Sequence, residues 1–214
     1  MTEANERQPR RPGPIGGDMA AIVFGLARRF RLNALMERHD STVVLGAFAF
    51  INGCIAIGLM ALAALVTGEP FVFPSLGPTA FLLFYTPLLA TASPRNTLCG
   101  HLIGVLAGYL ALVVFGLTDA PPALSTGVTG ARVGAAALSL GLTSGVMVWA
   151  RVPHPPAGAT TLIVSLGILH EPAQLAVLML AVLLLVVQGF VINRLAGIPY
   201  PVWAPRPAGE PPGP

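Results

Sequence analysis

The fold of this chain is decided by FVFPSLGPTAFLLF at residues 71–84 and HPPAGATTLIVSLG at residues 154–167. Aligned at an offset of 81 residues, Pro74–Thr79 and Pro155–Thr160 both read Pro-x-x-Gly-x-Thr, and each runs into an apolar tail. Proline cannot donate a backbone hydrogen bond, and it biases the residue before it away from helix. Each stretch is therefore predicted to be a broken segment that continues as a short helix.

Outside these two stretches, the chain has the composition of a membrane protein. Hydrophobic residues make up 54% of its 214 residues, and charged residues make up 10%. Soluble domains carry about 25% charged residues. The mean hydropathy of +0.75 agrees with this composition. An ordinary cytosolic enzyme is therefore excluded, and the lipid bilayer is the expected surrounding.

Six uncharged runs are candidate membrane segments, because a span of the hydrocarbon core takes about 20 residues. The expected fold class is therefore all-α, a polytopic transmembrane helix bundle. The runs are residues 42–67, 71–92, 96–117, 133–150, 154–169 and 172–192. The broken runs at 71–92 and 154–169 either cross the membrane, which gives six crossings, or re-enter on the same side, which gives four.

The arginines favour six crossings. Seven of the twelve arginines precede the first span, so the positive-inside rule predicts a cytoplasmic amino terminus. With six crossings, Arg95, Arg151, Arg194 and Arg206 join that cluster, and only Arg132 falls on the opposite side. With four spans, Arg95 and Arg151 move to the outside.

Six crossings divide into two three-segment repeats, inverted with respect to each other, each with a Pro/Gly-broken middle helix. Paired broken helices at matching places indicate the binding site of a transporter. The helix after each break points the positive end of its dipole and its free N–H groups into the bundle, which suits a small anion. Ser75, Thr79, Thr160 and Thr161 add hydroxyl groups nearby.

The run from His154 to Thr161, HPPAGATT, resembles the signature of the HPP family of integral membrane proteins. Pro74–Phe84 and the stretch Pro94–Asn96 followed by Gly100 and His101 resemble other recurring segments of that family. The resemblance covers residues 41–196. The resemblance implies a membrane protein. The family is usually described with four spans, and some of its members are implicated in nitrite transport.

The sequence and the resemblance together predict a transporter or channel for a small monovalent anion such as nitrite. The alternative is a membrane scaffold or regulatory partner that transports nothing. Abundant arginine and alanine without any lysine indicate a GC-rich bacterial genome, and hence the inner membrane.

The predicted binding residues lie in the two broken segments, and their prolines and glycines are expected to shape the backbone. They are Pro74, Ser75, Gly77, Pro78, Thr79, His154, Pro155, Pro156, Gly158, Thr160 and Thr161. His154 either binds substrate or a proton, or it only caps the broken helix. His101, with Arg95 and Asn96, is a candidate for gating or proton relay. For His101, a bond to neighbouring backbone is slightly favoured over pairing across the bundle.

The sequence contains no arrangement typical of an enzyme. Ser, His and acidic residues are not spaced for nucleophilic catalysis, and no His/Cys/acid cluster has metal-ligand spacing. A phosphate-binding loop that ends in lysine is excluded, because the chain has no lysine. We therefore expect no enzymatic activity, no cofactor, no metal and no nucleic-acid partner.

The ends of the chain differ from its centre. Residues 1–18 are expected to be a disordered cytoplasmic tail, and 197–214 a Pro-rich cytoplasmic tail. Residues 19–40 form a basic amphipathic stretch, either an interfacial helix or a helix packed under the bundle. The transmembrane domain is expected at 41–196. Its small size favours a homo-oligomer, by analogy with compact channels.

Overall fold

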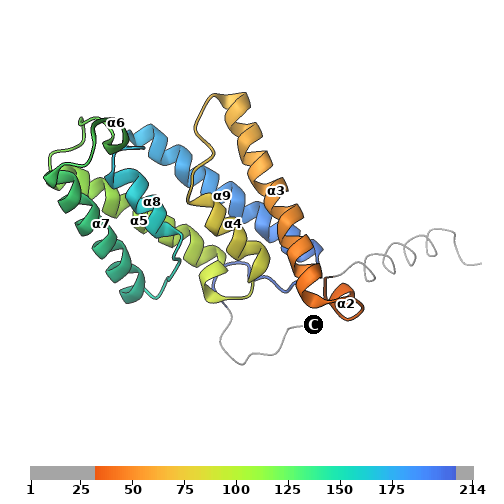
Figure 1. The fold of residues 1–214 in the computed structure, drawn as a ribbon. Coiled ribbons are helices and arrows are strands. Elements are labelled where there is room, and N and C mark those ends of the chain that lie inside the picture. The colour runs from red at the N-terminus through yellow and green to blue at the C-terminus, as the bar shows by residue number, and fades with distance from the viewer. Residues whose placement is uncertain (1–31, 206–214) are drawn as a thin grey trace, which may run out of the picture.

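The computed structural model describes residues 32–205, and this part of the chain is helical, without a strand (Figure 1). The all-α prediction is confirmed. Among the described residues, four helices are long and apolar enough to cross a membrane: α3 (Ser41–Thr67), α5 (Pro94–Val114), α7 (Gly130–Trp149) and α9 (Pro172–Leu195). The shorter elements are α2 (Leu32–Met36), α4 (Leu76–Tyr85), η1 (Ala90–Ala92), α6 (Ala123–Thr126) and α8 (Ala157–Ser165).

The long helices begin and end at residues suited to capping. The Asp40 carboxylate accepts hydrogen bonds from the first backbone N–H groups of α3, and Gly68 ends that helix with a φ of 74°. Ser93 caps α5 with Pro94 as the first helical residue, and Thr129 caps α7. These local signals fix where each long helix starts and stops.

The outer surfaces of the bundle are apolar, as contact with lipid requires. On α3, Phe50, Ile55, Leu59 and Leu65 are all exposed large hydrophobic side chains. The buried side of the same helix carries Ala56 and Met60, which pack into the core. Helices that are apolar all round are typical of membrane spans. The chain is therefore a multi-pass membrane protein in contact with the bilayer.

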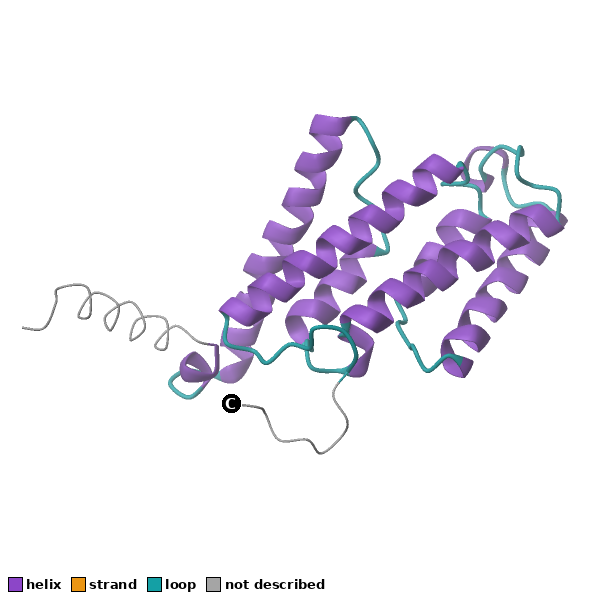
Figure 2. Ribbon diagram, turned by 180° about the vertical axis from the view of Figure 1, so that it is seen from behind, coloured by secondary structure: helices purple, strands orange, loops and turns teal. Residues whose placement is uncertain are grey.

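The two ends of the bundle can be identified from contacts between elements (Figures 1 and 2). At the α2 end, the Leu32 N–H donates to the Ala196 carbonyl, just beyond α9. There too, the Arg95 guanidinium, at the start of α5, donates to the Arg151 carbonyl just after α7. At the α6 end, the Ala123 N–H donates to the Leu166 carbonyl, just beyond α8.

Helices α3 and α5 both run away from the α2 end, and α7 and α9 both run toward it (Figure 1). The chain between α3 and α5 must therefore return along the bundle, and so must the chain between α7 and α9. Each return is a non-helical stretch followed by a short helix, α4 or α8. The prolines thus break both segments as the sequence predicts. Helix α4 runs from the bundle interior to the α2 end, and α8 runs from the interior to the α6 end (Figure 1).

A row of glycines lets α5 approach α8 closely. A Cβ on Gly100 would lie 2.7 Å from the His154 Cβ, and one on Gly104 would lie 2.8 Å from the Ala157 carbonyl oxygen. A Cβ on Gly108 would lie 2.7 Å from the Val164 Cβ. Such small-residue faces are a general device for helix packing in membranes. They hold α8 against the helix that carries His101.

Arg132 lies in the first turn of α7 and is buried, with 2% of its surface exposed. In the six-crossing topology predicted from the sequence, Arg132 is a charged loop residue on the side of the membrane opposite the other arginines. Instead, its guanidinium donates to the carbonyls of Ser165, Ala120 and Pro121 at 2.9–3.1 Å. The Ser165 carbonyl belongs to the last turn of α8, so the cation lies at the negative end of that helix dipole.

The packed part of the chain extends beyond residue 196, where the sequence predicts a tail. Ile198 and Tyr200 are buried, and the Tyr200 hydroxyl donates to the Ala92 carbonyl next to α5. Burial raises the pKa of Tyr200, because the charged phenolate would lose its hydration. The predicted tail at 1–18 and most of the amphipathic stretch 19–40 lie outside the described residues.

Arg151, just after α7, has a φ of 56°, a conformation that glycine adopts without cost. We expect Arg151→Gly to stabilise the protein by about 1 kcal/mol, because an L side chain in this region costs about 1–2 kcal/mol. Unfolding in detergent, followed by circular dichroism, measures the change. Arg151→Ala removes the same charge but keeps the Cβ, so it should give no such gain. Equal stability of the two variants would contradict this explanation.

Candidate functional site

A buried polar cluster lies where the two broken segments meet in the bundle interior. It consists of Thr79 from α4, His101 from α5, His154 from the stretch before α8, and Thr160 from α8. None of the four has any exposed surface. Buried polar groups in a membrane bundle are candidates for function.

Hydrogen bonds join these four side chains into a single network. The Thr79 hydroxyl lies 3.0 Å from Nε2 of His101 and 3.2 Å from Nε2 of His154. The two Nε2 atoms are 3.2 Å apart. Nδ1 of His101 lies 2.7 Å from the Thr160 hydroxyl. His101 thus pairs across the bundle with both broken segments. The sequence slightly favours the other interpretation, a bond from His101 to neighbouring backbone.

The partners of the two rings determine where their protons lie. Nδ1 of His154 is 2.7 Å from the Thr91 carbonyl, which can only accept, so this nitrogen carries a proton. In a neutral ring Nε2 of His154 is then an acceptor, and Nε2–H of His101 is its donor. Nδ1 of His101 accepts from the Thr160 hydroxyl. Thr79 donates to the Ser75 carbonyl at 3.0 Å and accepts from His101. In this assignment the single Nε2–H of His101 is shared between the Thr79 hydroxyl and Nε2 of His154, and the 3.2 Å contact between Thr79 and His154 carries no proton of its own.

The sequence predicts free N–H groups at the start of α8, and for this helix the prediction is wrong. The N–H groups of Ala157, Gly158 and Ala159 donate to the carbonyls three residues earlier, at 3.0–3.1 Å. The tight turn formed by Pro155 and Pro156 brings these carbonyls within reach. The positive end of α8 therefore acts on the cluster through its dipole, while the side chains supply the hydrogen bonds.

Two further hydroxyl groups from the predicted set lie on either side of the cluster. Ser75, at the start of α4, is fully buried, and its hydroxyl has no hydrogen-bond partner among the described residues. Thr161 pairs with Thr143 of α7 at 2.8 Å and also donates to the Ala157 carbonyl. Thr143 does not belong to the predicted set, because a single threonine within an apolar run gives no signal of its own.

Arg95 and Asn96 lie at the start of α5 and hold the stretch that leads to His154. Arg95 donates to the Arg151 carbonyl at 3.1 Å, and Asn96 donates to the Pro153 carbonyl at 3.4 Å. Arg95 also donates to the Asn96 side chain. These bonds connect the α2 end of the bundle to the backbone one residue before His154.

The prolines and glycines of the predicted set make no side-chain hydrogen bond to the cluster. Pro74, Gly77, Pro78 and Pro155 have exposed surfaces, whereas Pro156 is buried and precedes α8. A Cβ on Gly158 would lie 3.4 Å from Leu140 of α7. Their contribution is the backbone shape that brings Thr79, His154 and Thr160 together.

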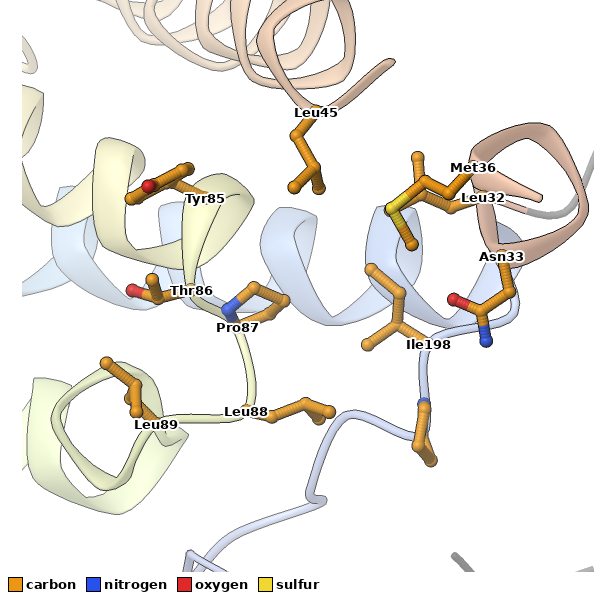
Figure 3. Close-up of a pocket in the computed structure, with 11 residues that line it drawn as sticks. Leu32, Asn33, Met36, Leu45, Tyr85, Thr86, Pro87, Leu88, Leu89 and Ile198 are labelled. Carbon is orange, nitrogen blue, oxygen red and sulfur yellow. The ribbon is translucent and has the colours of Figure 1, made fainter. Parts of the chain in front are cut away.

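A separate cavity of about 540 Å³ lies at the α2 end, between α2, α3 and the end of α4 (Figure 3). Leu45, Leu88 and Ile198 are among the side chains around it. None of the predicted binding residues lines this cavity, and its walls are mostly apolar. The polar side chains around it are Asn33, Tyr85 and Thr86, and among the described residues no charged side chain lines it.

Within residues 32–205, no group of three or more His, Cys, Asp or Glu side chains is placed to hold a metal ion. In the part of the chain that the structure describes, the further hydrogen-bonding neighbours of the two histidines are hydroxyl and carbonyl groups.

Comparison with known proteins agrees with the resemblance found in the sequence. A family model described as HPP, transmembrane region, matches residues 38–201. A protein from Dictyostelium discoideum, named only as a transmembrane protein, is 33% identical over 113 residues. The match covers 50% of this chain and 33% of that relative, so this chain aligns with only a third of it. No solved structure matches significantly.

Proposed function

The chain belongs to the HPP transmembrane family, and from this membership and the buried cluster between α4 and α8 we propose that it carries a small monovalent anion across the membrane. The observation that carries the proposal is the meeting of two half-helices at Thr79, His101 and His154. Helix N-termini favour anions, and broken helices that meet in a bundle are a recurring transporter device.

The proposed topology has six crossings and two inverted three-segment repeats. It is supported by the directions of the four long helices, since α3 and α5 are parallel and each repeat needs a returning middle segment (Figure 1). The amino terminus is cytoplasmic in this proposal, because seven arginines precede the first span. The membrane is a bacterial inner membrane.

The proposed substrate is nitrite or an anion of similar size and charge. The hydrogen-bonding groups at the cluster are hydroxyls and imidazoles, which bind one negative charge without a permanent cation. The buried Ser75 hydroxyl, which has no partner among the described residues, is available to such a ligand. A site without a fixed cation also releases its ligand readily, as transport requires.

Purified full-length protein in proteoliposomes tests this function. We expect nitrite uptake above that of protein-free liposomes at pH 7.5. Thr79→Val keeps the shape of the side chain but removes the hydroxyl that contacts both histidines. We expect its uptake rate to fall about fivefold, because one hydrogen bond contributes about 1 kcal/mol.

Thr86→Val is the matched control, because Thr86 lies at the end of the same helix and its buried hydroxyl has no partner among the described residues. It should transport like the wild type. Absence of uptake for nitrite, nitrate, formate and chloride by the wild type would exclude the transport role. Equal uptake rates for Thr79→Val and Thr86→Val would mean that the cluster is not the binding site.

A further inference from the structure

We propose that the His101–His154 pair binds one proton together with each anion, so that the protein moves a proton and a monovalent anion in the same direction. This inference rests on the transport function proposed above, and it names the co-substrate of the same site. It follows from the way in which the two rings face each other.

The neutral pair holds a single proton between its facing nitrogen atoms. Nδ1 of His154 is committed to the Thr91 carbonyl, so its Nε2 can only accept. Nε2–H of His101, 3.2 Å away, is the matching donor. The pair in this state is uncharged.

One further proton can be added without breaking this arrangement. It binds to Nδ1 of His101, provided that the Thr160 hydroxyl, 2.7 Å away, rotates from donating to accepting. A second added proton would place N–H groups on both Nε2 atoms, facing each other across 3.2 Å. The pair therefore alternates between a neutral state and a state with one positive charge.

This single charge matches the charge of the proposed substrate. An unpaired anion in an apolar bundle loses its hydration, at a high cost in free energy. With one proton on the histidine pair, the loaded site is neutral overall, and the cost of carrying it through the bundle falls. The only bond that changes is the N–H bond on His101, which forms with a proton taken from water on one side and breaks when that proton returns to water on the other.

Within residues 32–205, no other titratable side chain hydrogen-bonds to the pair. Among the described residues, the side chains that hydrogen-bond to either ring are Thr79 of α4 and Thr160 of α8. The charged side chains of the packed helices are arginines near helix ends, namely Arg95, Arg132 and Arg194, with Arg151 just after α7. The Tyr200 phenol donates to the carbonyl next to Thr91.

Proteoliposomes that contain a trapped pH-sensitive dye test the coupling. With the membrane potential clamped by potassium and valinomycin, an inward nitrite gradient should acidify the lumen by about one proton per nitrite, above the protein-free baseline. Because proton and anion charges cancel, the rate should not change when the imposed potential is reversed. His101→Gln should lower the ratio of protons to nitrite toward zero.

His170→Gln is the matched control, since His170 lies in the connection before α9 and bonds to the Gly167 carbonyl. It should keep the wild-type ratio. If His101→Gln fails to fold, the wild-type ratio and its voltage dependence decide alone. Nitrite uptake that follows the potential without acidification would overturn the coupling and leave anion transport in place. Absence of any anion flux would overturn both.

Discussion

Replacing Gly104 with alanine is expected to destabilise the protein by about 1–3 kcal/mol, the usual cost of inserting a methyl group into a tightly packed core. The new Cβ would lie 2.8 Å from the Ala157 carbonyl oxygen and 2.9 Å from the Thr161 hydroxyl. The carbonyl belongs to the backbone at the start of α8, so it cannot move alone. Helix α8 must shift away from α5, and Thr160 shifts with it away from His101.

Gly58→Ala on α3 is the control for this experiment. A Cβ at Gly58 meets no atom within 4 Å, so the substitution adds no contact. Alanine is favoured over glycine inside a helix by about 0.5–1 kcal/mol, and this variant should be neutral or slightly more stable. Reversible unfolding in mixed detergent micelles gives both free energies. If Gly104→Ala were as stable as Gly58→Ala, the close contact between α5 and α8 would be wrong.

The same two variants should also separate in function. Because the shift of α8 lengthens the 2.7 Å contact between Thr160 and His101, Gly104→Ala should lower nitrite uptake in proteoliposomes. Gly58 lies on the outer helix α3, so Gly58→Ala should keep the wild-type rate. The glycine row thus connects helix packing to the geometry of the cluster.

Much of the fold can be predicted from local sequence signals. Prolines 74, 155 and 156 predict the breaks, and the helices that follow begin at Leu76 and Ala157. Caps at Asp40, Ser93 and Thr129 set the starts of the long helices. Each of these signals acts within a few residues, which is why a sequence reveals it.

The site itself depends on contacts that no local pattern encodes. His101 and His154 are 53 residues apart, and their facing nitrogen atoms meet only because the glycine row brings α8 against α5. The commitment of His154 to the Thr91 carbonyl likewise depends on the course of the connection between α4 and α5. The sequence predicts which segments meet, whereas the structure supplies which atoms face each other.

Arg132 shows why a count of charges is incomplete as a guide to structure. The positive-inside rule treats every arginine near a span as a charge in water. Arg132 instead occupies a buried position where three carbonyl groups accept its hydrogen bonds. Its charge therefore stabilises the end of α8, and it carries little information about the side of the membrane on which it lies.

We expect Arg132→Met to destabilise the protein by about 2–5 kcal/mol. Hydrogen bonds to a charged donor contribute about 1.5–3 kcal/mol each, but removal of the buried cation also removes the cost of its desolvation, so the net loss is smaller than the sum of the three bonds. Methionine keeps much of the aliphatic length of arginine, so the loss of stability measures the contribution of the guanidinium group. The connection that contains Ala120 and Pro121 should loosen first, because two of the three bonds hold it. Hydrogen exchange at the Ala123 N–H, which donates to Leu166, should then accelerate.

Arg194→Met is the matched control. Arg194 is exposed in the last turn of α9, where its guanidinium lies 5.4 Å from the centre of the Phe190 ring. An exposed contact of this kind contributes about 0.5–1 kcal/mol, so the variant should unfold close to the wild type. Because α8 presents Thr160 to His101 at one end and is held by Arg132 at the other, Arg132→Met should also reduce nitrite uptake, whereas Arg194→Met should not. Similar stability of both variants would mean that the end of α8 does not depend on the buried cation.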